Sequence, residues 1–391
     1  NITIMKKIVT PLLLLFCTIA ATAQKAWLSG SGGLSVINAT NKQLTNTVCC
    51  GNMLYLTRSF DSSTIYVTHW FGDKIYYINA VTEAIVDSMT LYVGDIISDD
   101  TSDKLFASKP GGAHVYIIDP VAKTYDSIGV AGPNMLEKRP GVEEIWIMNN
   151  NQFSVLDYTG VPTVNSYPLT TGGTFARDEV RFTDDGNTAI MTEAFGNKIY
   201  KVDANTKQKL DSVTLPQVFG VEIADDNASF YASVPLQNKI YTYNIATMDP
   251  VDSVTTERNP FTMYTSPDGQ ELWVVDHNDD SVTVFNVANM TITHRIDLQS
   301  GGPYYLVFNT ASTAVNNVVA NAGLPFYPNP AEDRLYLTGN FDKVVVTDLV
   351  GRVIARYSHC SSIDVSGWQT GHYLLRLEKD GHTATYKMLK D

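Results

Sequence analysis

The sequence repeats one hairpin pattern along most of its length. DKIYYINAVTEAIVDSMTL (residues 73–91) returns as NKIYKVDANTKQKLDSVTL (197–215) and as NKIYTYNIATMDPVDSVTT (238–256). In each copy an alternating apolar run, an Asn or Asp with a short turn, and a second alternating run predict two antiparallel strands joined by a tight loop. A single hairpin cannot bury its apolar face, so the repeats are expected to pack on one another.

The spacing of the repeats predicts four strands in each unit. The Asn or Asp that ends the third strand recurs at intervals of 38 to 46 residues, at Asn38, Asn79, Asp119, Asp157, Asp203, Asn244 and Asn286. Ahead of several hairpins lie a further strand and a turn dipeptide, such as Asp185–Gly186 or Asp268–Gly269, which predicts another tight turn. A repeat of this length is typical of the blades of a propeller.

The two ends of the array complement each other. The first repeat begins at what would be a second strand, around Trp27, whereas an extra strand (303–309) follows the seventh repeat. Pairing of these two segments would close a ring and leave no blade incomplete. The sequence therefore predicts an all-β fold, with a seven-bladed β-propeller of four-stranded antiparallel blades over residues 24–320.

Short motifs inside the repeats resemble a known family. YVTH (Tyr66–His69), LWVVD (Leu272–Asp276) and SPDGQELWVV (Ser266–Val275) resemble the YVTN family of β-propeller repeats. The resemblance covers about residues 26–310. It implies the same propeller fold that the spacing predicts.

The pattern changes at Pro325. Alternating strands at Lys343–Thr347 and His372–Leu377, with glycines at the turns, predict a small β-sandwich over residues 321–391. YPNP (327–330), VVVTDLVGRVI (344–354) and GHYLLRL (371–377) resemble the C-terminal sorting domain, type A, of proteins exported by the type IX secretion system of Bacteroidota. The resemblance implies the secretion machinery as a partner, removal of the tail, and either release or attachment to the cell surface.

The first 23 residues resemble a targeting segment. Lys6 and Lys7 precede an apolar run that ends in Ala21, Thr22 and Ala23, which predicts a signal peptide cleaved near Ala23, with a few residues upstream of Met5. No other segment is long and apolar enough to cross a bilayer. We therefore expect a secreted or outer-membrane surface protein without a transmembrane segment in the mature chain.

Charge excludes one class of partner. Residues 24–324 hold 18 Lys and Arg against 33 Asp and Glu, whereas residues 325–391 hold eight of each kind. An acidic body repels phosphate backbones, so nucleic acid is not expected as a partner. We expect a monomer whose partner is an extracellular glycan, peptide or protein.

Candidate binding residues follow from the register of the repeats. In a propeller, the loops from second to third strand and from fourth to next first strand share one face, where ligands usually bind. Three groups of residues are expected there: polar residues at or near the end of second strands (His69, Lys109, Glu193, Asp276 and His277), aromatic residues (Trp70, Tyr304 and Tyr305), and arginines of the fourth-to-first loops (Arg139, Arg177 and Arg258). Aromatic rings suit stacking on sugars or peptide side chains, and arginines suit anions.

The sequence favours binding over catalysis. No nucleophile elbow, HExxH or phosphate-binding loop is present, and the histidines lack metal-ligand spacing, so no catalytic residue, metal or cofactor is predicted. The first hypothesis is a non-enzymatic binding module. The alternative is a propeller enzyme of lactonase or lyase type that uses His69, Glu193, Asp276 and His277 around the central channel. Convergence of His69, Glu193 and His277 on one point would favour the enzyme.

Overall fold

The computed structural model describes residues 24–48, 50–99, 102–109, 111–149, 152–169, 179–193, 197–256, 259–298, 301–309, 326–339, 341–348, 353–379 and 382–390. The expected signal peptide, Arg177 and Arg258 lie outside these ranges. The structure is all-β, with two single-turn 3-10 helices, η1 (Pro235–Gln237) and η2 (His277–Asp279). No helix in the described ranges is long and apolar enough to span a membrane.

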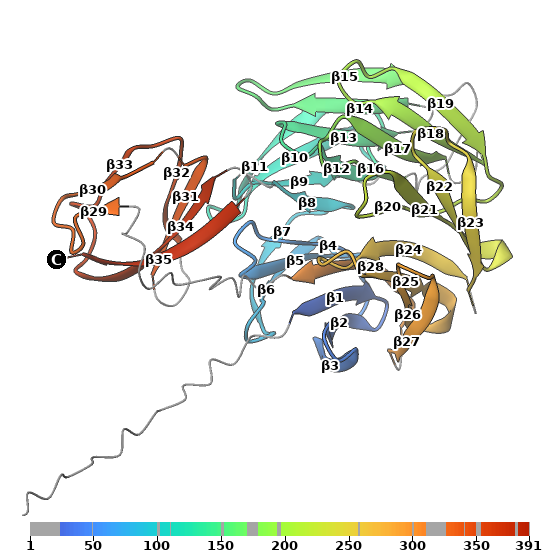
Figure 1. Ribbon diagram of the computed structural model, residues 1–391, viewed down its shortest axis with the longest axis horizontal. Coiled ribbons are helices and arrows are strands. Elements are labelled where there is room, and N and C mark those ends of the chain that lie inside the picture. The colour runs from blue at the N-terminus through green and yellow to red at the C-terminus, as the bar shows by residue number, and fades with distance from the viewer. Residues whose placement is uncertain are drawn as a thin grey trace, which may run out of the picture.

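Four-stranded antiparallel sheets fill residues 25–309 (Figure 1). One sheet contains β28 (Pro303–Asn309), β1 (Lys25–Gly30), β2 (Gly33–Asn38) and β3 (Gln43–Val48), and the next two along the chain contain β4 (Met53–Arg58), β5 (Thr64–His69), β6 (Lys74–Asn79) and β7 (Ile85–Thr90), and β8 (Ile96–Ser98), β9 (Leu105–Ser108), β10 (His114–Asp119) and β11 (Thr124–Gly129). They are followed by a sheet of β12 (Leu136–Lys138), β13 (Glu144–Asn149), β14 (Gln152–Asp157) and β15 (Thr163–Pro168), and a sheet of β16 (Val180–Phe182), β17 (Thr188–Glu193), β18 (Lys198–Asp203) and β19 (Lys209–Thr214). The remaining sheets contain β20 (Val221–Ile223), β21 (Ser229–Val234), β22 (Lys239–Asn244) and β23 (Pro250–Thr255), and β24 (Pro260–Thr265), β25 (Glu271–Asp276), β26 (Ser281–Asn286) and β27 (Thr291–Asp297).

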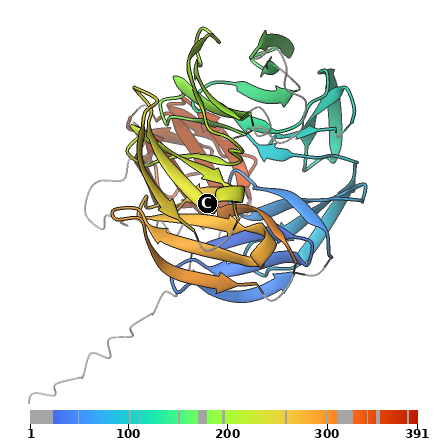
Figure 2. The same cartoon turned by 90° about the vertical axis from the view of Figure 1, so that its right-hand side faces the viewer.

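The sheets follow one another around a common centre. Their first strands are in contact in the order β28, β4, β8, β12, β16, β20 and β24, and β24 contacts β28 again. Figure 2 shows the same succession of sheets in chain order around the centre. The apolar side chains between neighbouring sheets form separate buried clusters, so each sheet is held mainly by the sheets beside it.

The predicted pairing of the two ends of the array is confirmed. β28 pairs antiparallel with β1, so that Val307 lies opposite Trp27 and Asn309 opposite Lys25. The Trp27 side chain is fully buried in this arrangement. The last strand of the array therefore completes the first sheet.

Two repeated side-chain roles explain why the sequence repeats as it does. The Asn and Asp residues predicted to end the third strands do so; for example, Asn79 accepts hydrogen bonds from the N–H groups of Val81 and Thr82, at 2.9 and 2.8 Å. Such a side chain forms the turn to the fourth strand. A buried hydroxyl near the end of several second strands joins sheets: Ser233 donates to the carbonyl of Phe261, at 2.7 Å.

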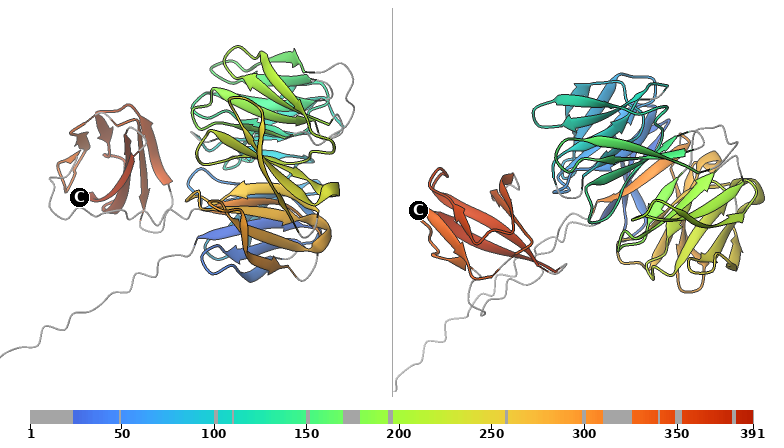
Figure 3. Two further views of the ribbon diagram at one scale, coloured as in Figure 1. Left: turned by 45° about the vertical axis from the view of Figure 1, so that its right-hand side comes forward. Right: turned by 90° about the horizontal axis from the view of Figure 1, so that it is seen from above.

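Residues 326–390 form two further antiparallel sheets, which lie beside the ring (Figures 1 and 3). One contains β29 (Phe326–Tyr327), β30 (Arg334–Leu337) and β33 (Ser362–Asp364); the other contains β32 (Val353–Ser358), β31 (Lys343–Asp348), β34 (Gly371–Lys379) and β35 (His382–Lys390). Leu335, Ile363, Val344 and Leu375, which come from both sheets, are fully buried in one shared core.

Candidate functional site

The loops between second and third strands and those between fourth and next first strands lie together. They are tied by backbone hydrogen bonds, such as Trp70 N–H to Asn52 O at 2.8 Å and Leu298 N–H to Asp280 O at 2.9 Å. The predicted sharing of one side of the ring by these loops is therefore confirmed. We call this side the loop face, and the side with the turns from first to second strands the opposite face.

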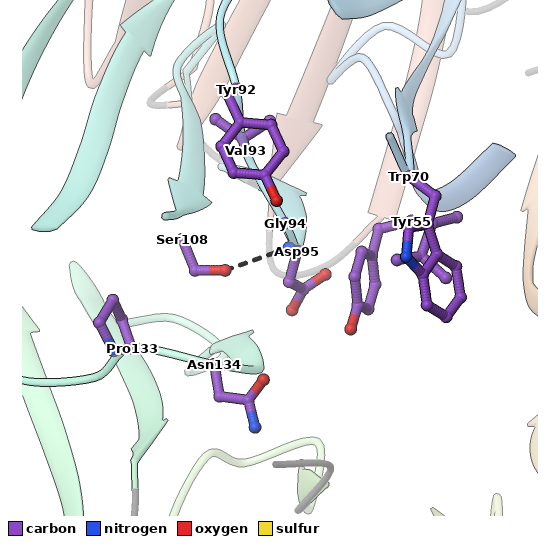
Figure 4. A pocket seen from close by; sticks show the side chains of 10 residues that line it. Tyr55, Trp70, Tyr92, Val93, Gly94, Asp95, Ser108, Pro133 and Asn134 are labelled. Atoms are coloured by element: carbon purple, nitrogen blue, oxygen red, sulfur yellow. Dashed lines mark hydrogen bonds between the residues drawn. The ribbon is translucent and has the colours of Figure 1, made fainter. Parts of the chain in front are cut away.

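A pocket of about 180 Å³ opens on the loop face where the sheets of β4, β8 and β12 meet. Figure 4 shows Tyr55 and Trp70 side by side along one side of the pocket, Tyr92 above, and Asp95 in the middle. The residues that line it are Leu54, Tyr55, Trp70, Tyr92, Val93, Gly94, Asp95, Ser108, Pro133 and Asn134. Aromatic rings and hydrogen-bonding groups thus meet in one concave site.

Asp95 is the charged group of this pocket. It precedes β8 and is 6% exposed. Its carboxylate accepts hydrogen bonds from the N–H groups of Ile96 and Leu136, at 2.8 and 2.7 Å, and its own N–H donates to the Ser108 hydroxyl at 3.1 Å. Burial raises the pKa of Asp95 to about 7, although these N–H donors and Arg181 favour the ionised form. The carboxyl therefore exchanges a proton near neutral pH.

A row of six rings crosses the loop face beside the pocket. Consecutive ring centroids are 3.9, 5.2, 4.6, 5.4 and 5.9 Å apart. The rings, which we call the aromatic arc, are those of Phe219, Phe261, His277, Tyr304, Trp70 and Phe71. They come from four neighbouring sheets, and Trp70 belongs both to the arc and to the pocket. At the end of the arc, the Phe71 side chain is 79% exposed.

The centre of the ring is filled at its loop-face end. Tyr305, on β28, is 7% exposed and stacks on Tyr55 with ring centroids 4.7 Å apart. Its hydroxyl lies 3.9 Å from the sulfur of Met135, which precedes β12. Because β28 and β12 belong to sheets that are not neighbours, this side chain bridges the centre, and it belongs to a buried cluster with residues of the β12 and β16 sheets.

Charged residues occupy the first strands farther along the centre. Arg181 on β16 pairs with Glu137 on β12 at 3.1 Å and with Glu222 on β20 at 3.2 Å, and it lies 4.0 Å from Glu179. Burial raises the pKa values of Glu137, to about 7, and of Glu179 and Glu222. One guanidinium thus balances three carboxyl groups contributed by three sheets.

The structure brings three of the predicted site residues together. Trp70, His277 and Tyr304 form the middle of the aromatic arc, and the Nδ1 atom of His277 lies 2.9 Å from the Pro303 carbonyl. Tyr305 lies beneath them as a buried residue rather than on the surface.

The other predicted polar residues do not converge. Glu193 accepts a hydrogen bond from the Tyr200 hydroxyl at 2.7 Å, and Asp276 accepts one from the Thr283 hydroxyl at 2.5 Å. His69 and Lys109 are half-buried at the ends of separate second strands. Within the described part of the chain, no three His, Cys, Asp or Glu residues are placed to hold a metal ion, so His69, Glu193 and His277 do not meet the convergence condition set for the enzyme of lactonase or lyase type.

The prediction for Arg139 is wrong. It lies in the turn between β12 and β13, on the opposite face, and not in a fourth-to-first loop. Its side chain is 6% exposed; it pairs with Glu144 at 3.1 Å and donates to the carbonyl of Gly186 at 2.7 Å and to Asn205. It therefore joins two sheets. The strand before Arg139, β12, has only three residues and no clear alternation, so its position is hard to predict from the repeat pattern.

Several pocket residues are not among those predicted from the sequence. Asp95, Asn134 and Tyr92 lie in the loops that precede β8 and β12. The available signal was position, because Asp95 directly precedes a first strand, as does Glu179 two repeats later.

One protein family matches part of the chain. Residues 325–391 match the family described as "Secretion system C-terminal sorting domain". This match indicates export through type IX secretion to the cell surface or beyond. Among curated proteins, none matches the chain.

Solved structures similar to this chain are β-propeller-like. A putative 6-phosphogluconolactonase from Bacteroides fragilis is 13% identical, with a TM-score of 0.61, and the match covers 74% of this chain and 99% of that one. A periplasmic gluconolactonase from Pseudomonas aeruginosa is 14% identical, with a TM-score of 0.60 and coverage of 73% and 98%. The β-propeller domain of Cps50 (Swd1) from Myceliophteria thermophila is 12% identical, with a TM-score of 0.53 and coverage of 64% and 88%. At these identities the likeness shows the fold alone: a β-propeller precedes a region similar to secretion sorting domains.

Proposed function

We propose that this protein is an exported, non-enzymatic binding module that holds an extracellular glycan on its loop face. The observation that carries the proposal is the pocket in which Trp70 and Tyr55 lie next to Asp95 and Asn134. Aromatic faces stack on the apolar face of a sugar ring, while a carboxyl and an amide accept and donate hydrogen bonds to its hydroxyl groups. A peptide or protein ligand remains the competing outcome of the test below.

The size of the pocket limits what enters it. Its volume of about 180 Å³ is below the roughly 300–1,000 Å³ of pockets that enclose a drug-sized molecule. One sugar ring or one side chain therefore occupies the pocket. The rest of a longer ligand would follow the part of the aromatic arc that runs from Trp70 to Phe219.

The proposal is tested with the mature chain on a glycan and peptide array, followed by calorimetric titration of the best hits. We expect neutral oligosaccharides to bind and Trp70→Ala to weaken binding about five- to thirtyfold, because stacking on one ring contributes about 1–2 kcal/mol. Val121→Ala, at an 82% exposed position beyond β10, is the matched control. Binding of peptides alone, or equal affinity of the Trp70→Ala variant, would contradict the glycan site.

The finer architecture belongs to the same proposal. We infer a seven-bladed ring over residues 24–320, made of YVTN-type repeats, and a sorting β-sandwich over 321–391, with a signal peptide cleaved near Ala23. The cyclic contacts of the first strands and the β28–β1 pairing support the ring. The shared core of the last two sheets supports the sandwich. Mass spectrometry of the protein secreted by a Bacteroidota host would give both cleavage points.

A lactonase-type enzyme is the second candidate. Two of the similar structures are lactonases by name, and the pocket contains a carboxyl group, that of Asp95, whose pKa is raised to about 7. A general base works best when its pKa lies near the operating pH. The test is hydrolysis of gluconolactone and 6-phosphogluconolactone by the wild type and by Asp95→Asn. Acceleration that is lost in this variant would favour the enzyme over the binding module.

A further inference from the structure

The region similar to sorting domains, residues 326–390, which we call the tail, contacts the propeller at a defined place. Phe60 lies in the turn between β4 and β5, and Asp103 in the turn between β8 and β9, so both belong to the opposite face of the ring. Arg356, on β32, donates to the two carboxylate oxygens of Asp103, at 2.8 Å from Nη2 and 3.2 Å from Nε. The two oxygens are thus held by two nitrogens of one guanidinium, which is a directional arrangement.

Phe60 supplies the apolar part of this contact. The Nζ atom of Lys343 lies 3.2 Å from the centroid of its ring, and the guanidinium carbon of Arg356 lies 4.5 Å from it. A cation above an aromatic ring is attracted to the negative face of the ring. One propeller side chain therefore engages two basic residues from adjacent strands, β31 and β32.

The outer face of the β32–β31–β34 sheet carries a buried valine next to this contact. Val344 and Val346 point into the tail's own core and are fully buried, so Val345 between them points outward. Val345 is nevertheless only 6% exposed. It lies opposite Arg356 on one side and Arg376 on the other. Arg356, Val345 and Arg376 thus form a row of two basic side chains around a buried apolar one, on the face of the sheet turned to the propeller.

The contact is weak enough to dissociate. Asp103 keeps 46% and Arg356 20% side-chain exposure, and an ion pair exposed to this extent contributes about 1 kcal/mol or less. The buried Nη1 atom of Arg356 has no hydrogen-bond partner, and burial, followed by the charge of Arg376, lowers the pKa of Arg58 on β4. Both features oppose docking. Because the tail and the propeller are parts of one chain, such weak contacts are enough to hold them together.

We propose that Phe60 and Asp103 form a docking site for the chain's own residues 326–390, and that the tail is held against the propeller by this salt-sensitive latch. In the docked form the outer face of the β32–β31–β34 sheet is unavailable to other partners. The secretion machinery therefore either separates the tail from the propeller or binds the other side of the tail.

Small-angle X-ray scattering of the full chain at 50 and 500 mM NaCl tests the latch. The wild type is expected to be compact at low salt and more extended at high salt, because salt screens partly exposed charges. Asp103→Arg and Arg356→Asp should each raise the maximum dimension at low salt, and the double variant with both changes should restore the compact form. Phe60→Ala should extend the chain without changing its charge.

Asp252→Arg, at an exposed position on β23, is the control and should leave the maximum dimension unchanged. Circular dichroism and thermal melting establish that every variant is folded. A wild type that is already extended at 50 mM NaCl, or single variants as compact as the wild type, would overturn the proposal. Failure of the double variant to regain the compact form would show that Asp103 and Arg356 do not hold the tail as a pair.

Discussion

One carboxylate oxygen of Asp95 accepts a hydrogen bond from the backbone N–H of Leu136 at 2.7 Å, although the two residues belong to neighbouring sheets. The same relationship recurs farther round the ring, where Glu179 accepts from the N–H of Val221 at 3.0 Å. In both cases an acid directly before a first strand fixes the start of the next sheet. At Asp95 the same carboxyl also lines the pocket, so the joint between sheets and the proposed ligand binding would depend on one group.

This double role makes stability depend on pH. The pKa of Asp95 is raised by burial from an ordinary value of 3.8 to about 7, so the folded state binds this proton more tightly than the unfolded state. The stabilisation from the protonated carboxyl is fully present below about pH 4 and is lost as the pH rises through about 7. It corresponds to roughly 4 kcal/mol at most.

We therefore expect urea unfolding of the wild type to show a larger loss of free energy between pH 4.5 and 7.5 than unfolding of Asp95→Asn. The amide of the variant does not titrate. It has only one oxygen in place of the two that accept backbone N–H groups, which costs about 1 kcal/mol at every pH. Equal pH slopes for the two proteins would contradict the raised pKa.

Arg181→Met should destabilise the fold by about 3–5 kcal/mol at pH 7, because it leaves Glu137, Glu179 and Glu222 without their shared counter-charge. The comparison variant is Arg295→Met. The Arg295 side chain is 32% exposed, against 18% for Arg181, so its ion pair with Asp279 should contribute about 1 kcal/mol or less. Chemical denaturation at pH 7 measures both. A loss at Arg181 no greater than that at Arg295 would show that the central pairs are solvated.

Ser29→Ala should weaken the closure of the ring. The Ser29 hydroxyl is fully buried; it contacts the carbonyl of Leu54, and it lies 3.2 Å from the carbonyl and 3.3 Å from the N–H of Tyr305. Its removal leaves buried backbone groups without a partner, at a cost of about 1–3 kcal/mol. In Ser29→Ala, the hydrogen-exchange rates of β1 and β28 should rise more than that of β17. Ser31→Ala, at an exposed position, should leave the exchange rates of β1 and β28 unchanged.

Arg139→Leu should reduce stability by about 3–5 kcal/mol and leave ligand affinity of the folded protein unchanged. The guanidinium is buried between Glu144, Asn205 and the Gly186 carbonyl on the opposite face, so it cannot contact a ligand in the pocket. Thermal melting and calorimetric titration separate the two effects. A loss of affinity with full stability would restore the original interpretation of Arg139 as an anion-binding residue.

The repeat positions were predictable because they have local physical causes. Each Asn or Asp at the end of a third strand accepts backbone N–H groups of the turn directly after it, as Asp203 does for Asn205 and Thr206. Such a contact depends only on residues that are adjacent in the sequence. Pairing of 303–309 with β1 was predictable for another reason, since the first repeat lacked a first strand and 303–309 was a first strand that no repeat followed.

The pocket could not be predicted in the same way. Asp95, Asn134 and Trp70 come from three repeats, and the raised pKa of Asp95 depends on burial by side chains that are far away in the sequence. The aromatic arc likewise joins residues from Trp70 to Phe261 through the closing strand. Only the packing of neighbouring sheets determines which of the many loop residues meet.

The antiparallel register of β28 on β1 places Lys25 and Asn309 opposite each other, on the side of the ring away from the pocket. The chain before the propeller and the chain after it therefore depart from adjacent points. A protein pulled or tethered through either terminus would keep its loop face, where we propose that the ligand binds, turned outward, and an anchor added at one end would shield the other end before it shielded the pocket.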